Sequence, residues 1–227
     1  MLISSFGSIR KSLMTTIRFA AAVLSVCGCQ EKQAVLQQSA ANPAPPNNSA
    51  RPELFPEKVT LSLAERPVTL QLTGQATRKA MYVAIYRIAS YCDEKKSYHD
   101  VDELAAADIS KQLQLAMERD ISSESLTRGF EEGFARNDPS AKYEDEKRVM
   151  LDYFRQSPLK KGDRILITHL PASGVSIQVG DKTAVEIRDL GFAHVVWKMY
   201  MGPRGLGEHV RRGLGERLKA NSSERAD

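Results

Sequence analysis

The fold of this chain is constrained most by short turns between segments in which apolar and polar residues alternate. Turns this short require that the strands on either side of them run antiparallel. Between residues 165 and 187, apolar residues recur at every second position, which is the period of a half-buried strand. Residues 171–174 (Pro-Ala-Ser-Gly) form one break and Gly180-Asp181 the next, and breaks this short join antiparallel strands. The pattern predicts a three-stranded antiparallel meander over residues 165–170, 175–179 and 184–187.

The rest of the folded part combines further strands with helices. Alternation or strand-forming composition predicts strands over residues 68–73, 81–91 and 111–117. Leu126, Phe130 and Phe134 share a helix face behind the candidate N-caps Ser122 and Ser123. Three more helices are expected over residues 143–156, 189–201 and 206–218. Because strands follow strands through short turns while helices group together, the predicted fold class is α+β with an antiparallel sheet.

The N-terminal segment has the features of a targeting signal. Three basic residues precede an apolar run over residues 19–26, which is too short to cross a bilayer because a spanning helix takes about 20 apolar residues. A basic start, a short apolar run and a small-residue exit predict a secretory signal peptide. The sequence Val26-Cys27-Gly28-Cys29 resembles the lipobox of bacterial lipoproteins, so we expect cleavage before Cys29 and its lipidation. Ordinary cleavage with release of a soluble protein is the alternative.

Composition divides the chain into four parts. Residues 1–28 are the expected signal peptide, and residues 29–51 are an expected lipid-anchored, flexible linker because they are rich in Gln, Ala, Asn, Ser and Pro. A folded domain is expected over residues 52–218, and the polar residues 219–227 are expected to be a disordered tail. This organisation predicts tethering on the periplasmic side of a bacterial envelope. Gln30 after the acceptor cysteine favours the outer membrane, and the soluble periplasm is the alternative.

The charge distribution argues against one class of partner. The chain has 32 Lys and Arg against 28 Asp and Glu, for a formal charge of +4. Three of the basic residues precede the first acid, Glu31, so the remainder is almost neutral. Nucleic-acid-binding domains are usually strongly basic, and we therefore expect no nucleic-acid partner.

Six short motifs, taken in order along the chain, resemble the chalcone isomerase-like family. They are Leu72-Thr73-Gly74 with Arg78-Lys79 and Tyr82, Arg119-Asp120-Ile121-Ser122, Glu132-Gly133-Phe134, Lys161-Gly162-Asp163, Leu170-Pro171 with Gly174, and Met201-Gly202-Pro203 ahead of Arg212-Gly213-Leu214-Gly215. The resemblance implies an open-faced fold, in which a large antiparallel sheet is layered with helices that enclose a pocket. The family contains plant enzymes that close a chalcone to a flavanone, non-catalytic fatty-acid-binding relatives, and many bacterial members.

Three side chains are the predicted ligand-binding residues of that pocket. If residues 78–86 form one unbulged strand, Arg78, Tyr82 and Tyr86 share a face, because side chains alternate with period two. Small alanines separate them, which leaves room for an apolar group beside a guanidinium and two phenols. A guanidinium meets a carboxylate bidentately, and in the resembling family the matching arginine faces the pocket. The alternative is a surface arginine paired with an acid, with the tyrosines covering the sheet.

The opposite face of the same expected strand carries Lys79, Met81, Val83 and Ile85. We expect this face to be an ordinary core stripe. The pattern therefore assigns ligand binding to one face and packing to the other.

The resemblance also implies that catalysis is absent. The plant enzymes pair their arginine with a threonine, a tyrosine, an asparagine and a further hydroxyl residue. Placing the motifs side by side puts Val83, Ser125, Glu132 and Met199 at or near those positions. We therefore assign no catalytic residue, and an isomerase of the chalcone type is the alternative.

Other clusters carry weaker signals. His194 shares a helix face with Leu190, Trp197 and Met201, which suits a core histidine or, alternatively, an axial haem ligand. The charged run over residues 93–103, with His99, Asp100, Asp102 and Glu103, is interpreted as a solvated loop, so no metal site is assigned. The glycine pairs at residues 205 and 207 and at residues 213 and 215 are expected at helix ends and close packing contacts.

Three functions from different classes remain open. The first is an envelope-tethered, non-catalytic binding protein for an apolar ligand with an anionic end, such as a fatty acid. The second is an intramolecular lyase of the chalcone isomerase type, and the third is a haem- or partner-binding protein. No cofactor is expected for the first two, and a homo-oligomer is compatible with all three.

Overall fold

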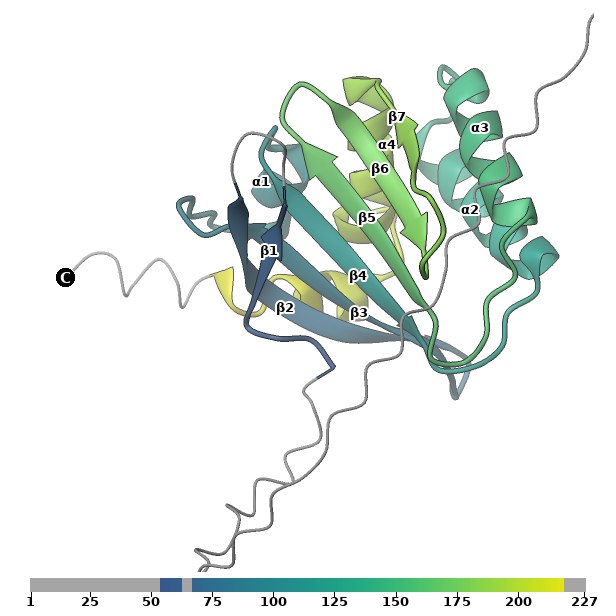
Figure 1. The fold of residues 1–227 in the computed structure, drawn as a ribbon, viewed down its shortest axis with the longest axis horizontal. Helices are drawn as coiled ribbons and strands as arrows, with labels where there is room; N and C mark the ends of the chain where they lie inside the picture. Colours follow the sequence, from purple (N-terminus) through teal and green to yellow (C-terminus); the bar gives the residue numbers. More distant parts are fainter. Residues whose placement is uncertain (1–53, 63–66, 219–227) are drawn as a thin grey trace, which may run out of the picture. The chain divides into compact units, whose positions relative to one another are not determined.

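The computed structural model describes residues 54–62 and 67–218 (Figure 1). The expected signal peptide, Cys29, the linker and the C-terminal tail lie outside these residues. Among the helices that are described, none is both long and apolar enough to cross a membrane.

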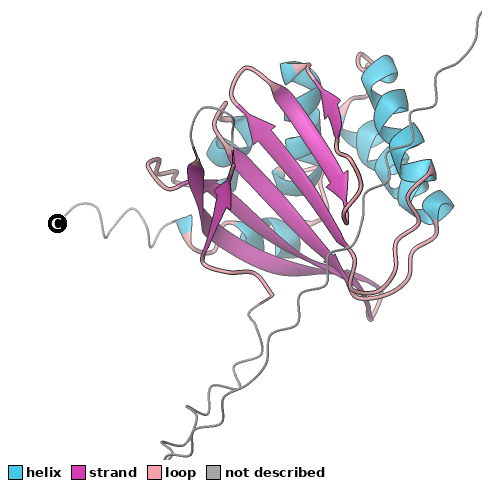
Figure 2. Cartoon of the chain, in the orientation of Figure 1, coloured by secondary structure: helices cyan, strands magenta, loops and turns pink. Residues whose placement is uncertain are grey.

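The domain is built on a curled seven-stranded antiparallel sheet (Figure 2). Its strands follow the order of the sequence, and each pairs antiparallel with the next. They are β1 (Lys58–Leu61), β2 (Val68–Ala80), β3 (Val83–Asp93), β4 (Lys111–Met117), β5 (Arg164–Leu170), β6 (Gly174–Val179) and β7 (Val185–Ile187). The expected meander is confirmed as β5 to β7, and it continues through all the other strands.

The described residues also form five helices. They are α1 (Val101–Ala106), α2 (Ser123–Asn137), α3 (Glu144–Arg155), α4 (Leu190–Met201) and α5 (Glu208–Leu214). In the view of Figure 2, α1, α4 and α5 lie behind the sheet, while α2 and α3 lie beside it. The contacts agree, because α4 packs on β6, α5 on β2, and α2 on both α3 and α4. The predicted α+β class is confirmed.

Helix starts follow the capping residues that the sequence offers. The Ser122 hydroxyl accepts from the Ser125 N–H at 3.3 Å and begins α2, as expected. Asp189 begins α4 by accepting from the Phe192 N–H at 2.7 Å. The charged run over residues 93–103 was expected to be a loop throughout, and this is wrong at its end. Asp100 accepts from the N–H groups of Asp102 and Glu103 at 2.9 Å each and begins α1.

Two hydrophobic clusters lie on opposite faces of the sheet. The larger cluster fills the space between sheet and helices and includes Leu113, Ile167 and Trp197. The smaller one, on the other face, includes Phe55 and Tyr91. Because both faces are covered here, every residue of β4 is buried.

A close backbone approach joins α5 to β2. A Cβ added at Gly74, where φ is +155°, would lie 2.1 Å from the Gly213 carbonyl oxygen. A Cβ at Gly213 would lie 2.7 Å from the Gln75 carbonyl oxygen. The Thr73 hydroxyl then donates to the Leu214 carbonyl at 2.9 Å. Gly213 is therefore a packing glycine, as the sequence indicated.

The β2–β3 hairpin corrects the expected strand over residues 78–86. β2 ends at Ala80 and β3 begins at Val83, so Met81 and Tyr82 form a two-residue turn in which Met81 has a φ of +55°. The expected core stripe is also wrong, because Met81 is 90% exposed and Val83 52% exposed. Residues 75–89 contain no Gly, Pro, Asn, Asp or Ser, so the sequence carries none of the usual turn signals here.

Candidate ligand-binding cavity

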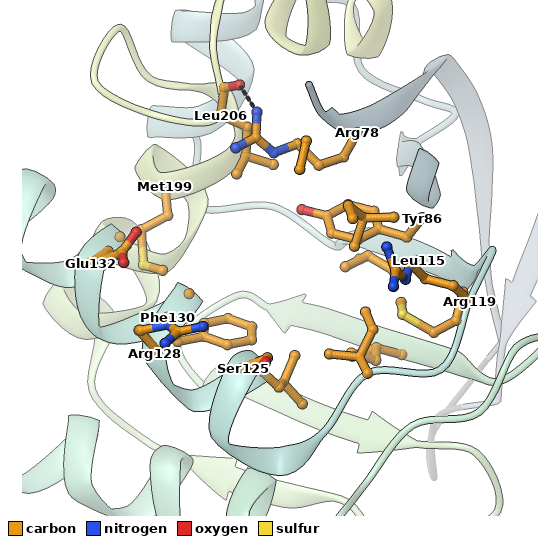
Figure 3. Close-up of a pocket in the computed structure, with 18 of the residues that line it drawn as sticks. Arg78, Tyr86, Leu115, Arg119, Ser125, Arg128, Phe130, Glu132, Met199 and Leu206 are labelled. Carbon is orange, nitrogen blue, oxygen red and sulfur yellow. Dashed lines mark hydrogen bonds between the residues drawn. The ribbon is translucent and has the colours of Figure 1, made fainter. Parts of the chain in front are cut away.

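A cavity of about 500 Å³ lies between the sheet and α2 (Figure 3). This volume is within the range of roughly 300 to 1,000 Å³ that is usual for small-molecule sites. Much of its wall is apolar and comes from strands, α2 and α4: Ile85, Leu115, Met117, Leu126, Phe130, Ile165 and Met199. The cavity can therefore accommodate an apolar chain.

Two local patterns produce this apolar wall. Leu115 and Met117 are two residues apart on β4 and point to the helix side. Leu126 and Phe130 are four residues apart on α2 and point back toward the sheet. The Phe130 ring stacks on Phe154 of α3 with centroids 4.4 Å apart, which supports this wall from behind.

Arg78 and Tyr86 face each other across the β2–β3 hairpin and both line the cavity. The Leu206 carbonyl oxygen accepts a hydrogen bond from Nη1 of Arg78 at 3.2 Å. Figure 3 shows this bond at one side of the cavity and the Tyr86 hydroxyl directed into the enclosed space. Among the described residues, Arg78 forms no ion pair. The alternative of a surface arginine paired with an acid is therefore not what the described residues show.

The tyrosines of the cavity are neutral hydrogen-bonding groups. Burial raises the pKa of Tyr86, and the nearby Arg78 charge opposes this only in part. Burial also raises the pKa of Tyr200 well above its ordinary value, and the Tyr86 phenol adds to the effect. A protonated phenol can donate to an anion. At this side of the cavity, the wall thus offers the positive charge of Arg78 and a neighbouring hydroxyl donor.

The cavity is bordered by charged residues, and basic ones predominate. Arg119, Arg128 and Arg136 line it together with Asp120 and Glu132. Asp120 accepts from the Lys161 N–H at 2.9 Å and from Nζ of Lys160 at 3.2 Å. Hydrogen bonding, first from the Lys161 N–H, lowers the pKa of Asp120. Its carboxylate is therefore already stabilised within the protein.

Of the three predicted ligand-binding residues, the structure brings two together. Arg78 and Tyr86 line the cavity, whereas Tyr82 is 95% exposed in the turn and does not line it. The sequence interpretation missed Tyr200 of α4, which also lines the cavity. Its signal was helical periodicity, but a buried tyrosine on a helix is not distinguished from ordinary core by spacing.

The resemblance placed four residues at or near the catalytic positions of the plant enzymes, and three of them line the cavity. Ser125, Glu132 and Met199 line the cavity, as that comparison implied. Val83 lies outside it, at the exposed start of β3.

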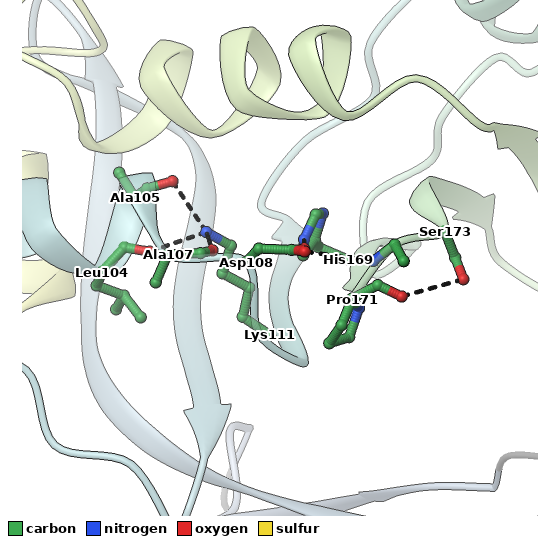
Figure 4. Close-up of polar contacts among 9 residues, drawn as sticks. Leu104, Ala105, Ala107, Asp108, Lys111, His169, Pro171 and Ser173 are labelled. Carbon is green, nitrogen blue, oxygen red and sulfur yellow. Dashed lines mark hydrogen bonds and ion pairs between the residues drawn. The ribbon is translucent and has the colours of Figure 1, made fainter.

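His194 lies in a second, smaller pocket of about 140 Å³. There, Nζ of Lys111 donates to the carbonyl oxygens of Leu104, Ala105 and Ala107 at 2.8, 2.9 and 2.7 Å (Figure 4). The same Nζ lies 4.7 Å from the centroid of the Trp197 ring, and Nε2 of His169 lies 2.7 Å from Oδ1 of Asp108.

Burial controls the titration of the groups around this second pocket. It lowers the pKa of both His169 and His194. Burial also lowers the pKa of Lys111 to about 7, although Asp108 and the three carbonyl oxygens favour the ammonium form. The pocket is smaller than the roughly 300 Å³ at which ligand and cofactor sites begin. It therefore does not fit the haem alternative for His194.

The acidic cluster at the start of α1 forms contacts within the fold. Asp100 caps α1, Glu103 accepts from the His99 N–H at 2.8 Å, and Asp102 pairs with Arg211. Across residues 54–62 and 67–218, no group of three or more His, Cys, Asp or Glu could hold a metal ion.

Comparison with known proteins relates this geometry to one family. The sequence profile described as "Chalcone isomerase-like" matches residues 55–214. The crystal structure of a fatty-acid binding protein from Arabidopsis thaliana has a TM-score of 0.57 and 14% sequence identity to this chain. That match covers 74% of this chain and 100% of the plant chain, and at this identity it establishes a shared fold. Among curated protein sequences, none matches.

Proposed function

Because the chain belongs to the chalcone isomerase-like family, with the family match spanning residues 55–214, we propose that it is a binding protein for a fatty-acid-like ligand. The ligand has an apolar chain and one anionic end. The observation that carries the proposal is the placement of Arg78 and Tyr86 beside an apolar cavity of about 500 Å³.

The chemistry of the two cavity walls supports this ligand class. An acyl chain against Leu115, Phe130 and Met199 leaves water, which is worth about 0.8 kcal/mol per buried methylene. A carboxylate beside Arg78 receives a charge-assisted hydrogen bond, and Tyr86 supplies a second donor. The plant protein of similar fold is described as a fatty-acid binding protein, which is consistent with this assignment.

The same proposal includes tethering at the bacterial envelope. Its support is the apolar run over residues 19–26 followed by the lipobox-like sequence that ends at Cys29. Intact mass of the mature protein tests it. We expect a lipid-modified N-terminal Cys29 in the membrane fraction, and an unmodified N-terminus beyond Cys29 would contradict the tether.

Native mass spectrometry of protein purified from its source tests the ligand. We expect an added mass in the range of a single acyl chain, released on denaturation, and no Soret band in the absorption spectrum. A Soret band would favour the haem alternative. An empty cavity that takes up no fatty acid on titration would count against the binding role.

Chalcone-type isomerisation is the second candidate. It is favoured by the presence of Ser125 and Tyr86 beside Arg78 in one cavity. It is weakened by Met199 and Glu132, which stand where the resemblance places a hydroxyl and an amide.

A further inference from the structure

The tip of the β2–β3 hairpin is an apolar projection beside the cavity. Three of the five large hydrophobic residues that are exposed among the described residues are consecutive here: Met81, Tyr82 and Val83, at 90%, 95% and 52% exposure. Ala80, directly before the tip, lines the cavity, and so does Ile85 shortly after it. The projection therefore extends outward from the cavity wall itself.

The backbone of this tip favours a residue other than the one present. Met81 has a φ of +55°, whereas Tyr82, the other turn residue, has no positive φ. A two-residue hairpin turn with a positive φ at its first position usually has glycine there, because a side chain is strained in this conformation. The turn thus carries a strained methionine whose side chain lies in solvent. Ala141 and Ala172 have a similar positive φ, but they carry only a methyl group, whereas Met81 displays a large apolar side chain that nothing in the packing of the described domain requires.

The surroundings of the tip are predominantly basic. Figure 1 shows the turn at the same end of the sheet as the segments that follow β4 and precede β5. The Glu118 N–H donates to the Ile85 carbonyl at 3.0 Å, and the Gly162 N–H donates to the Met117 carbonyl at 2.8 Å, which holds these segments together. The exposed cations of the hairpin tip, these segments and the nearby part of α2 are Lys79, Arg119, Arg128, Lys160 and Lys161. The acids there are the exposed Asp120 and Glu124 and the half-buried Glu118 and Asp163.

We propose that this tip docks onto the surface of an anionic phospholipid bilayer and opens a path for ligand between the bilayer and the cavity. A small apolar tip surrounded by cations suits the boundary between headgroups and acyl chains, where tyrosine is favoured and each nearby basic residue adds attraction to anionic lipid. A stable protein interface needs about 800 Å² on each partner. Three residues at one hairpin tip, with charged residues nearby, are better suited to insertion than to such a contact.

Tryptophan fluorescence with brominated lipids tests the contact directly. The chain has one tryptophan, and Trp197 is buried, so its signal should not respond to lipid. Tyr82→Trp in the full chain is compared with Val149→Trp, a position on α3 that is 47% exposed. Both variants carry the same N-terminal segment, so any tether acts equally on both. We expect the quenching of Tyr82→Trp on phosphatidylglycerol vesicles to exceed that of Val149→Trp by about twofold or more, and to fall on phosphatidylcholine vesicles or in high salt.

Two outcomes would overturn the proposal. Equal quenching at both positions would show that the tip does not enter the bilayer. A shift in Tyr82→Trp emission that depends on protein concentration without vesicles would identify the tip as a contact between proteins.

The variant Met81→Gly tests whether the Met81 side chain contacts the membrane or instead stabilises the fold. Glycine relieves the strain and removes the side chain, so we expect the thermal midpoint to rise or stay the same. The quenching of Tyr82→Trp in the Met81→Gly background should fall about twofold or more. A drop in the midpoint, with unchanged quenching, would assign Met81 to the fold and not to the membrane.

A transfer assay tests whether the tip provides a path for ligand between the bilayer and the cavity. This part of the inference rests on the proposed fatty-acid binding. The probe is an anthroyloxy-labelled fatty acid that moves from vesicles to the full chain. We expect Met81→Gly to slow transfer about threefold or more while the equilibrium affinity stays unchanged. Unchanged transfer would overturn the ligand path. If the probe never binds, the fatty-acid proposal fails, while the quenching result on the tip still stands.

Discussion

Arg78 and Lys111 are both basic residues on the helix face of one sheet, but their surroundings give them different roles. Lys111 is almost completely buried, and the three donors of its ammonium group all reach carbonyl oxygens at the end of α1. Arg78 is half-buried beside a cavity and gives one hydrogen bond to the Leu206 carbonyl. A guanidinium has five N–H donors, so Arg78 retains capacity for a ligand. The role of a basic residue on this face therefore depends on how many of its donors the protein itself satisfies.

Replacement of Arg78 should have the largest effect on binding. In Arg78→Ala we expect fatty-acid affinity to fall by about 2 to 5 kcal/mol, because the carboxylate is left in a largely apolar site without its charged partner. Isothermal titration calorimetry measures the loss, and thermal unfolding checks that the fold is kept. Arg188→Ala is the control, since Arg188 is exposed and lies outside the cavity. Equal affinities in Arg78→Ala and the parent would remove the proposed distinction between the two cations.

Replacement of Lys111 should act on stability alone. Lys111→Met keeps an apolar stem against Trp197 but leaves three carbonyl oxygens without their donor. We expect the free energy of unfolding to fall by about 2 to 4 kcal/mol, measured by urea denaturation. Lys142→Met is the matched control, because Lys142 also lies over an aromatic ring, at 5.1 Å from Tyr143, but is exposed. A loss of fatty-acid affinity in folded Lys111→Met would contradict the assignment.

The two tyrosines of the hairpin should differ in the same experiment. In Tyr86→Phe we expect a loss of about 0.5 to 1.5 kcal/mol in fatty-acid affinity, as for one neutral hydrogen bond. Tyr82→Phe should leave affinity in solution unchanged, because Tyr82 lies outside the cavity. If Tyr82→Phe were the weaker binder, the ligand would extend beyond the cavity to the hairpin tip.

The second pocket should make stability depend on pH. The pKa values of His169 and His194 are lowered by burial, so below about pH 6.5 the unfolded chain binds more protons than the folded one, and stability decreases as the pH is lowered. The lowered pKa of Lys111, about 7, acts in the same direction at higher pH. We expect the urea midpoint to rise from pH 5.5 to pH 8, and the rise to be smaller in His194→Gln. A midpoint that falls with pH would show that these groups gain protons on folding.

The smallest expected effect is on chemistry. Incubated with naringenin chalcone, the protein should give no flavanone above the rate in buffer, because Met199 and Glu132 replace polar partners that such sites need. The absorbance of the chalcone measures the rate. A rate above buffer that disappears in Arg78→Ala would reverse the preference for binding over catalysis.

Several elements of the fold could be predicted because their signals are local. The alternation in β4 predicted a strand over Lys111–Met117, which the structure shows with the same bounds. Ser122 marked the start of α2, because a cap needs only a side chain and the next turn of backbone. The motif order indicated the family that the profile match over residues 55–214 then established.

The candidate site was predicted only in part, because its geometry depends on pairing between strands. Arg78 and Tyr86 were correctly placed on one face, but for the wrong reason, since they lie on two strands and not on one. Tyr82 was placed beside them by the same error. The register of β3 against β4 and the shift in the β2–β3 pairing, from Arg78 opposite Tyr86 to Lys79 opposite Ala84, decide where the hairpin turns.

Local sequence patterns specify the antiparallel α+β fold, most of its elements and the positions of Arg78 and Lys111 within strands. Tertiary structure alone decided which of these two cations was satisfied by the protein and which faced a cavity. The end of α1 lies against Lys111, whereas α2 stands away from Arg78 and leaves space between helix and sheet. Periodicity specifies the face on which a side chain lies, but the groups that meet it across that face come from distant parts of the chain.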